Sequence, residues 1–119
     1  MLNPSSQQTN DETLIKVVIK NDIPAQTIKI HCYSYMKVDL GVHELSYGAN
    51  FTFEFRTIIP PVTKYGCEFI TSYGYGNYEV FSNYLEAYEC HEYCLWSVQA
   101  GGPCLQTFDK GEVDCKSWK

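Results

Sequence analysis

The sequence predicts an all-β protein, an antiparallel β-sandwich of about eight short strands that is held together by disulfides. Short segments of alternating apolar and polar residues recur at intervals of roughly ten residues, with turn-forming residues between them. Ten tyrosines and six phenylalanines favour strands, because a flat ring packs well on a pleated, half-buried surface. Six cysteines in 119 residues indicate a disulfide framework, typical of a small secreted domain.

The N-terminal half is predicted to contain a disordered tail and four strands. Residues 1–12 are almost entirely polar and form the tail, and residues 13–119 form one domain. In the second strand, Ile28, Ile30 and Cys32 alternate with polar residues and therefore share the buried face. The next strong signal places Phe51, Phe53 and Phe55 on one face. The four strands are expected at residues 14–20, 27–35, 42–45 and 51–56.

The C-terminal half is predicted to continue with short strands after a break at Pro60-Pro61. One helical turn is expected between them, at residues 84–88. The last two strands should form a hairpin around residues 109–111, where Asp, Lys and Gly favour a turn. The strands are expected at residues 65–71, 78–81, 93–98, 104–108 and 112–118.

The charge and the terminal sequence limit the possible partners and compartments. A net charge of −5 argues against binding to nucleic acid or to an anionic membrane surface, since both require a basic face. No apolar run approaches the roughly 18 residues needed to span a membrane. Residues 1–10 lack the apolar centre of a signal peptide, so we expect a mature chain whose leader has been removed. The alternative is a cytosolic protein with six free thiols.

The spacing of the cysteines favours one disulfide directly. The six cysteines are Cys32, Cys67, Cys90, Cys94, Cys104 and Cys115. Cys104 and Cys115 flank the predicted C-terminal hairpin, so a bridge between them would close a short loop. The remaining four cysteines allow three connectivities, which the sequence alone does not separate.

Among these connectivities we prefer Cys32–Cys94 with Cys67–Cys90. A metal or haem site is the competing use of Cys90, His91 and Cys94. Zinc would need a second closely spaced pair of ligands, which is missing, and haem attachment needs a histidine directly after the second cysteine. We therefore expect no metal and no cofactor.

Catalysis is not expected, because no nucleophile, base and orienting group stand in a recognisable motif. The available bases are His31, His43 and His91, each of which is expected at the surface or hydrogen-bonded. The carboxylates that could act as an acid–base pair are Glu54, Glu68 and Glu79. Such carboxylates more commonly solvate the polar face of a sheet, so the chain is expected not to be an enzyme.

An ordered set of short motifs resembles the plant self-incompatibility S-protein family, also called S-protein homologues. The resemblance spans residues 14–118, and its motifs occur in the family's order. They are HC at 31–32, DLGVH at 39–43, FTFEFR at 51–56, CEF at 67–69, CLWSV at 94–98, GPCL at 102–105 and CKSW at 115–118.

The resemblance implies a small secreted plant protein with a β-sandwich fold. In the founding members it implies a ligand secreted by the stigma and recognised by a membrane receptor of the pollen. The expected partner is accordingly an extracellular or membrane receptor protein, bound by a monomeric ligand. Two alternatives from other classes are a lectin-like carbohydrate-binding module and a secreted defence protein such as an inhibitor.

Two predicted loops are candidates for the contact with that partner. The first covers residues 38–48 and contains Asp39, His43 and Tyr47. The second covers residues 72–77, where Tyr73 and Tyr75 alternate with glycines. Tyrosines on loops supply a large contact area at a low cost in conformational entropy.

A glycosylation sequon occurs at Asn50-Phe51-Thr52, just before the strand rich in phenylalanine. In a secreted chain, a glycan at this site requires Asn50 to lie at the surface. That requirement agrees with the turn predicted at residues 46–49.

Overall fold

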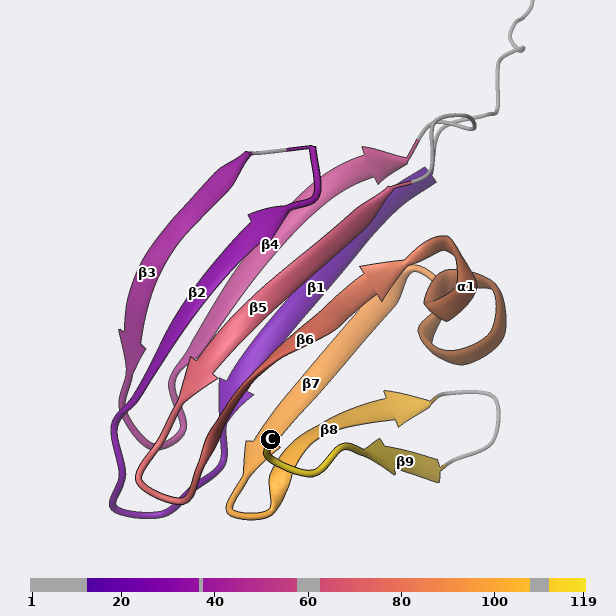
Figure 1. Ribbon diagram of the computed structural model, residues 1–119. Helices are drawn as coiled ribbons and strands as arrows, with labels where there is room; N and C mark the ends of the chain where they lie inside the picture. The colour runs from indigo at the N-terminus through magenta and orange to yellow at the C-terminus, as the bar shows by residue number, and fades with distance from the viewer. Residues whose placement is uncertain (1–12, 37, 58–62, 108–111) are drawn as a thin grey trace, which may run out of the picture.

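The computed structural model describes residues 13–36, 38–57, 63–107 and 112–119, which form two packed β-sheets (Figure 1). The five-stranded sheet has the order β4-β1-β7-β8-β9. Its strands are β1 (Thr13–Asn21), β4 (Asn50–Thr57), β7 (Tyr93–Gln99), β8 (Gly102–Thr107) and β9 (Glu112–Cys115). The four-stranded sheet has the order β3-β2-β5-β6. Its strands are β2 (Ile28–Ser34), β3 (Asp39–Leu45), β5 (Lys64–Ile70) and β6 (Tyr75–Ser82). The predicted all-β sandwich is confirmed.

One strand pair departs from the antiparallel arrangement predicted from the sequence. β1 pairs antiparallel with β4 but parallel with β7. A parallel pair requires a long crossover connection between its strands. Here the connection contains the whole four-stranded sheet, which local sequence patterns do not reveal.

The predicted strands are all present in the described residues, but two are longer than predicted by three residues or more. The strand expected at 42–45 extends over Asp39–Leu45, and the strand expected at 78–81 extends over Tyr75–Ser82. Both additions contain glycines that were interpreted as turn residues, yet their backbones pair with β2 and β5. Conversely, the last strand ends at Cys115 rather than at residue 118.

The predicted helical turn is present as α1 (Asn83–Leu85), followed by a π-helical turn, η1 (Glu86–Cys90). Ser82 caps α1, since its hydroxyl oxygen accepts a hydrogen bond from the Leu85 N–H at 3.1 Å. The predicted tail at 1–12, the Pro60-Pro61 break and the turn at 109–111 lie outside the described residues.

The core lies between the two sheets and follows the predicted alternation. In β2, Ile28, Ile30 and Cys32 are buried, while the residues between them reach the surface. Trp96 on β7 is 1% exposed, and its indole N–H donates to the Val80 carbonyl on β6 at 2.9 Å. This bond joins the two sheets across the core, where an unpaired indole N–H would be costly.

All six cysteines form disulfides, in a pattern that corrects two predicted pairings. The predicted Cys104–Cys115 bridge is present and joins β8 to β9. The other bridges are Cys32–Cys67 and Cys90–Cys94, so the preferred Cys32–Cys94 and Cys67–Cys90 pairings are wrong.

The sheet topology explains the observed pairing. Cys32 and Cys67 face each other across the neighbouring strands β2 and β5, with their Cα atoms 4.0 Å apart. Cys94 lies on β7 in the other sheet, where the η1 turn brings Cys90 within a Cα distance of 5.0 Å. Both distances are short enough for a bridge without long-range rearrangement.

Candidate recognition surfaces

The predicted contact residues are divided between two ends of the sandwich. Residues 38–48 are not a loop, because most of them form the edge strand β3. β3 has seven residues, so about 20 Å separates Asp39 at its start from the turn that carries Tyr47. The β3–β4 turn lies instead at the same end of the sandwich as the β5–β6 turn (Figure 1). Tyr47 belongs to the first of these turns and Tyr73 to the second.

We call this end the loop end and define it as residues 22–27, 46–49, 71–75 and 100–101. It is organised by Asn21, a polar residue with no exposed surface. The Asn21 amide donates to the Gln26 carbonyl at 2.8 Å and to the Leu45 carbonyl at 2.9 Å. Its side-chain oxygen accepts from the Ile23 N–H at 2.9 Å. One buried side chain therefore fixes the β1–β2 connection against the end of β3.

The β5–β6 turn is fixed by its own side chains. The Thr71 hydroxyl accepts hydrogen bonds from the N–H groups of Tyr73 and Gly74, both at 3.0 Å. The same hydroxyl donates to the Gly74 carbonyl at 2.8 Å. The neighbouring Ser72 hydroxyl donates to the Gln26 side-chain oxygen at 2.6 Å. These bonds join the turn to the β1–β2 connection and limit its movement.

Three tyrosines project from this framework into solvent. The exposed fractions are 58% for Tyr47, 57% for Tyr73 and 64% for Tyr75. The C-terminal residues support the same end, since the Lys119 N–H donates to the Tyr75 carbonyl at 3.0 Å. The Trp118 indole N–H donates to the Ala100 carbonyl at 2.8 Å. The loop end thus presents exposed tyrosines on backbone that both sheets hold in place.

At the opposite end, β3 contains a bulge. His31 pairs with Val42, and Tyr33 pairs with Asp39, so one residue of β2 opposes two residues of β3 between these pairs. Gly41 supplies the left-handed backbone that the bulge requires, with a φ of +90°. Bulges of this kind redirect the neighbouring side chains.

The bulge turns Asp39 towards His31. The Asp39 carboxylate accepts hydrogen bonds at 2.8 Å from the Gly41 N–H and from His31 Nε2. The backbone bond lowers the pKa of Asp39 below its usual 3.8, and His31 lowers it further. Asp39 remains 69% exposed within this pair.

His43 lies on β3, within the short strand predicted at residues 42–45, and its ring is hydrogen-bonded rather than free to contact a partner. Its Nε2 donates to the Leu40 carbonyl at 2.9 Å. Its ring stacks on Phe51, with 3.9 Å between the centroids. His43 therefore supports the bulge from the inner side and links β3 to β4 at the sandwich edge.

A surface that was not predicted lies next to the bulge, on the outer face of the four-stranded sheet. Tyr33 starts on β2, crosses β5, and donates its hydroxyl to the Asn77 side chain on β6 at 2.6 Å. Gly66 on β5 makes this possible, since an added Cβ there would lie 3.0 Å from the Tyr33 hydroxyl and 3.2 Å from the Tyr35 ring. We call Tyr33 and Tyr35, lying over Gly66, the tyrosine platform.

The platform forms one side of an open hollow of about 420 Å³. The hollow is lined by His31, Tyr33, Ser34, Tyr35, Val38 and Asp39. Partial burial raises the pKa of the Tyr35 hydroxyl above its usual 10.0, and Tyr33 and Glu79 raise it further, so the hydroxyl stays protonated. Predicting this site would have required knowing that β2, β5 and β6 are neighbours. The only sequence signal was the outward face assigned to His31 and Tyr33.

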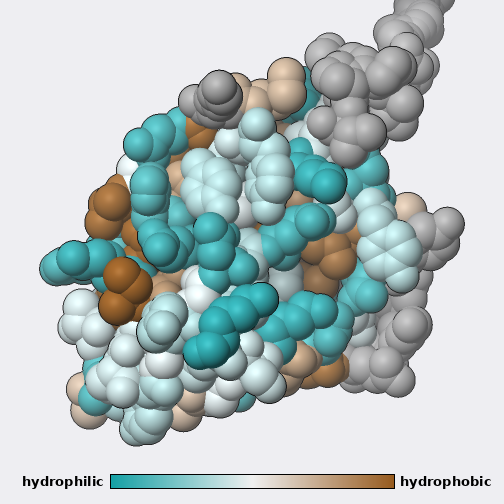
Figure 2. All heavy atoms as spheres, in the orientation of Figure 1, coloured by the Kyte–Doolittle hydropathy of each residue, from teal (hydrophilic) through white to brown (hydrophobic). Residues whose placement is uncertain are grey.

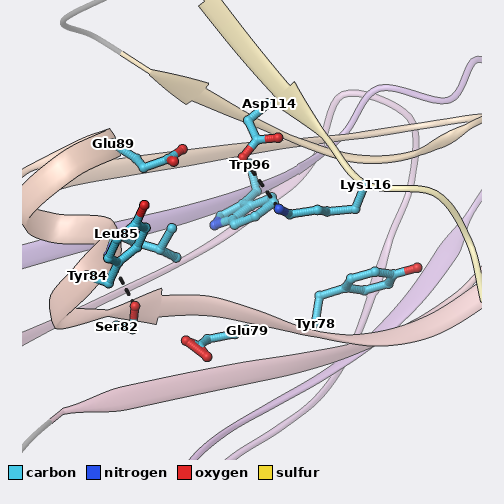
Figure 3. Close-up of a pocket in the computed structure, with 9 residues that line it drawn as sticks. All are labelled: Tyr78, Glu79, Ser82, Tyr84, Leu85, Glu89, Trp96, Asp114 and Lys116. Carbon is cyan, nitrogen blue, oxygen red and sulfur yellow. Dashed lines mark hydrogen bonds and ion pairs between the residues drawn. The ribbon is translucent and has the colours of Figure 1, made fainter.

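A second hollow, of about 400 Å³, opens between β6, β9 and the helical turns (Figure 3). Its carboxylates are Glu79, Glu89 and Asp114, of which Asp114 pairs with the Lys116 ammonium at 3.4 Å. None of its nine lining residues is a histidine or cysteine. The serine in this hollow, Ser82, has its hydroxyl oxygen engaged as the cap of α1, where it accepts from the Leu85 N–H.

The other carboxylates with a possible catalytic role are divided between the two sheets, although Glu68 and Glu79 lie close together on neighbouring strands. Glu54 lies on β4 of one sheet, whereas Glu68 and Glu79 lie on β5 and β6 of the other. His91 lines a separate hollow together with Glu86. Burial raises the pKa of Glu86 and the nearby Glu92 raises it further, whereas His91 partly offsets this rise.

Metal binding and membrane spanning were also considered for the part of the chain that the structure describes. Within those residues, no cluster of histidine, cysteine, aspartate and glutamate side chains could hold a metal ion. The helical segments described are likewise too short to cross a membrane. Asn50 of the sequon lies exposed at the start of β4, and its side-chain oxygen accepts from the Thr52 hydroxyl at 3.1 Å.

The face of the molecule towards the viewer in Figure 2 is mostly polar, with small separate hydrophobic patches. A large continuous apolar patch, which would indicate a permanent protein interface, is not visible on this face.

Comparison with known proteins relates the chain to plant proteins of one kind. The family model described as plant self-incompatibility protein S1 matches residues 16–118. S-protein homolog 29 of Arabidopsis thaliana is 29% identical over 104 residues, which is 86% of this chain and 76% of that protein. S-protein homolog 5 of the same plant is 25% identical over 103 residues, which is 87% of this chain and 77% of that protein.

Proposed function

Because this chain belongs to the plant self-incompatibility protein S1 family, we propose that it is a secreted recognition ligand that acts by binding a cell-surface receptor. The family membership confirms the resemblance found in the sequence motifs. The receptor role is the one that this resemblance implies. In this proposal the protein acts through its surface rather than through catalysis.

The observation that carries the proposal is the construction of the loop end. Tyr47 and Tyr73 lie on turns held by the buried Asn21 and by Thr71, Tyr75 begins β6 next to the second turn, and each of the three is more than half exposed. Tyrosine offers a large amphipathic contact area, and a fixed backbone reduces the entropy lost on binding. Such a surface is suited to docking against a receptor protein.

Secretion is supported by the state of the cysteines. All six are paired in disulfides, and such frameworks persist in oxidising compartments and extracellular space. The exposed position of Asn50 is compatible with glycosylation on the secretory route. We propose that the ligand acts as a monomer.

The test is saturable binding of the fluorescently labelled, oxidised protein to plant protoplasts, with unlabelled protein as competitor. The Tyr73→Ala/Tyr75→Ala double variant should bind at least about tenfold more weakly, as expected when aromatic anchors are lost. Tyr35→Ala is the matched control, because Tyr35 is 52% exposed but lies outside the loop end. Unchanged binding of the double variant would refute the role of the loop end. The protoplasts should come from both reproductive and vegetative tissues. If the wild-type protein shows no saturable binding to any of them, the receptor role is refuted.

A further inference from the structure

We propose that the tyrosine platform binds a neutral oligosaccharide chain, on a surface separate from the loop end. This inference goes beyond the proposed receptor role and does not depend on it. The occupant is a hexose chain whose sugar rings stack on the aromatic faces. Its hydroxyl groups would bond to the polar side chains around them.

The first support is the orientation of the two rings. Tyr33 reaches from β2 to Asn77 on β6, so its ring must lie across the intervening strand β5. The Tyr35 ring lies beside it, with 5.9 Å between the centroids and an angle of 32° between the planes. Both rings approach Gly66, whose missing side chain leaves them room to lie against the sheet. The result is a broad aromatic surface that faces outwards.

The platform is also fixed before any ligand arrives. The bond between Tyr33 and Asn77 holds one ring, and the Lys64 ammonium lies 5.8 Å from the centroid of the Tyr35 ring. Tyr33 on β2 pairs with Gly66 on β5. The next pair along the same two strands is Cys32 and Cys67, whose disulfide holds the strands together. A preformed surface loses little conformational entropy on binding.

The second support is the chemistry of the surrounding groups. Asp39 is paired with His31 but remains 69% exposed, so its carboxylate can accept hydrogen bonds from hydroxyl groups. Lys64 beside Tyr35 supplies donors. Because the platform has both a carboxylate, on Asp39, and an ammonium group, on Lys64, beside it, its charges favour neither an anionic nor a cationic ligand. Apolar faces with a few placed donors and acceptors match the alternating C–H and O–H surfaces of a sugar.

A proline-rich peptide is the strongest rival occupant, since such segments also dock on aromatic side chains. Those docking sites are grooves between aromatic rings. Here the rings lie side by side against the sheet, and Gly66 beneath them is covered rather than open. The geometry therefore favours stacking of flat rings over insertion of a proline ridge.

The experiment is isothermal titration of the oxidised protein with cellohexaose, a neutral chain whose hydroxyl groups are all equatorial and whose ring faces carry only C–H groups. Hexagalacturonate and decaproline serve as probes for an acidic sugar chain and for a proline-rich peptide. Saturable binding of cellohexaose with one site per chain is expected. Binding of only hexagalacturonate or only decaproline would overturn the proposal, as would no heat from any of the three up to the solubility limit of cellohexaose.

Variants then locate the binding site. Tyr35→Ala should weaken cellohexaose binding about tenfold, whereas Tyr35→Phe, which keeps the ring, should stay within about twofold of wild type. Gly66→Ala should also weaken binding, because the new Cβ would lie 3.0 Å from the Tyr33 hydroxyl and 3.2 Å from the Tyr35 ring, so both rings must shift slightly while neither is removed. Circular dichroism and thermal unfolding should be close to wild type for the two Tyr35 variants, since that side chain is half exposed.

The loop end supplies the internal control. Tyr73→Ala should leave cellohexaose binding unchanged, and Tyr35→Ala should leave protoplast binding unchanged. Equal cellohexaose binding by wild type and Tyr35→Ala would place the sugar elsewhere and overturn the inference. The two proposals can therefore fail independently of each other.

Discussion

The most informative substitution for stability is Asn21→Ala, because one buried side chain holds the loop end together. Asn21 makes three side-chain hydrogen bonds, to Ile23, Gln26 and Leu45, at 2.8–2.9 Å. Alanine would remove all three and leave one backbone N–H and two carbonyls without these partners. The substitution also shortens a side chain that has no exposed surface.

The size of the effect follows from these bonds. Each is worth about 1 kcal/mol net, and buried groups left unpaired add a further cost. We expect Asn21→Ala to lower the free energy of unfolding by about 3–5 kcal/mol. Since a domain of this size typically has about 5–15 kcal/mol in total, the loss would remove a large part of its stability.

The assay is urea unfolding of the oxidised protein, monitored by the combined fluorescence of the buried Trp96 and the partly buried Trp118. Asn77→Ala is the matched control, because Asn77 is exposed and makes one side-chain bond, so its loss should stay below about 1 kcal/mol. A loss below about 1 kcal/mol for Asn21→Ala would refute the organising role of this residue.

Asn21→Asp adds a sharper test. It keeps the shape of the side chain but replaces the amide donor with an oxygen that faces two carbonyls. At neutral pH it should therefore destabilise at least as much as alanine, because a charge is buried without a partner. Part of that loss should be recovered in acid, where the carboxyl group gains a proton and can donate one bond.

Three further predictions concern the disulfides, the bulge and the glycan. Serine replacement of both cysteines in the β2–β5 bridge, which spans 35 residues, should cost about 4 kcal/mol in urea unfolding. Serine replacement of both cysteines in the Cys90–Cys94 bridge, which spans four residues, should cost about 2 kcal/mol. A larger loss of stability for the shorter bridge than for the longer one would contradict the loop-entropy model. The lowered pKa of Asp39 means that the ionised form stabilises the fold above the ordinary value of 3.8. That contribution is lost as the pH falls through 3.8 towards the folded-state pKa. The melting temperature of the wild type should therefore fall more steeply in acid than that of Asp39→Asn. Parallel plots of melting temperature against pH for the two proteins would disprove the stabilising role of the Asp39 carboxylate. Expression in a plant secretory system should add a glycan that peptide N-glycosidase A removes and that Asn50→Gln abolishes, whereas equal masses of the two proteins would show an unused sequon.

Much of the fold could be predicted because local alternation reports directly which face of a strand is buried. The alternation in β2 and the three phenylalanines of β4 identified core faces that the structure retains. The parallel β1–β7 pair and the Cys32–Cys67 bridge were not predicted. Both depend on which strands become neighbours, and no local pattern specifies that.

The candidate surfaces were predicted only in part, for the same reason. Tyr73 was correctly expected at an exposed turn, because glycines and polar residues surround it. Asp39 was assigned to a loop before Gly41, and the strand containing His43 was expected to begin only at residue 42, whereas Gly41 forms a bulge within a strand that begins at Asp39. The tyrosine platform needs Tyr33, Gly66 and Asn77 from three strands, and their proximity exists only in the folded sheet.

The position of β1 has a consequence for how the molecule is made. The four-stranded sheet uses strands between residues 28 and 82, so the growing chain contains all of it well before synthesis ends. β1, by contrast, occupies an interior position whose second neighbour, β7, begins only at Tyr93. Until that segment emerges, Ile15, Val17 and Ile19 lack one side of their sheet, a condition that slows folding and invites association with other chains. β1 is thus synthesised before the other described strands but is among the last of them to be completed by its neighbours.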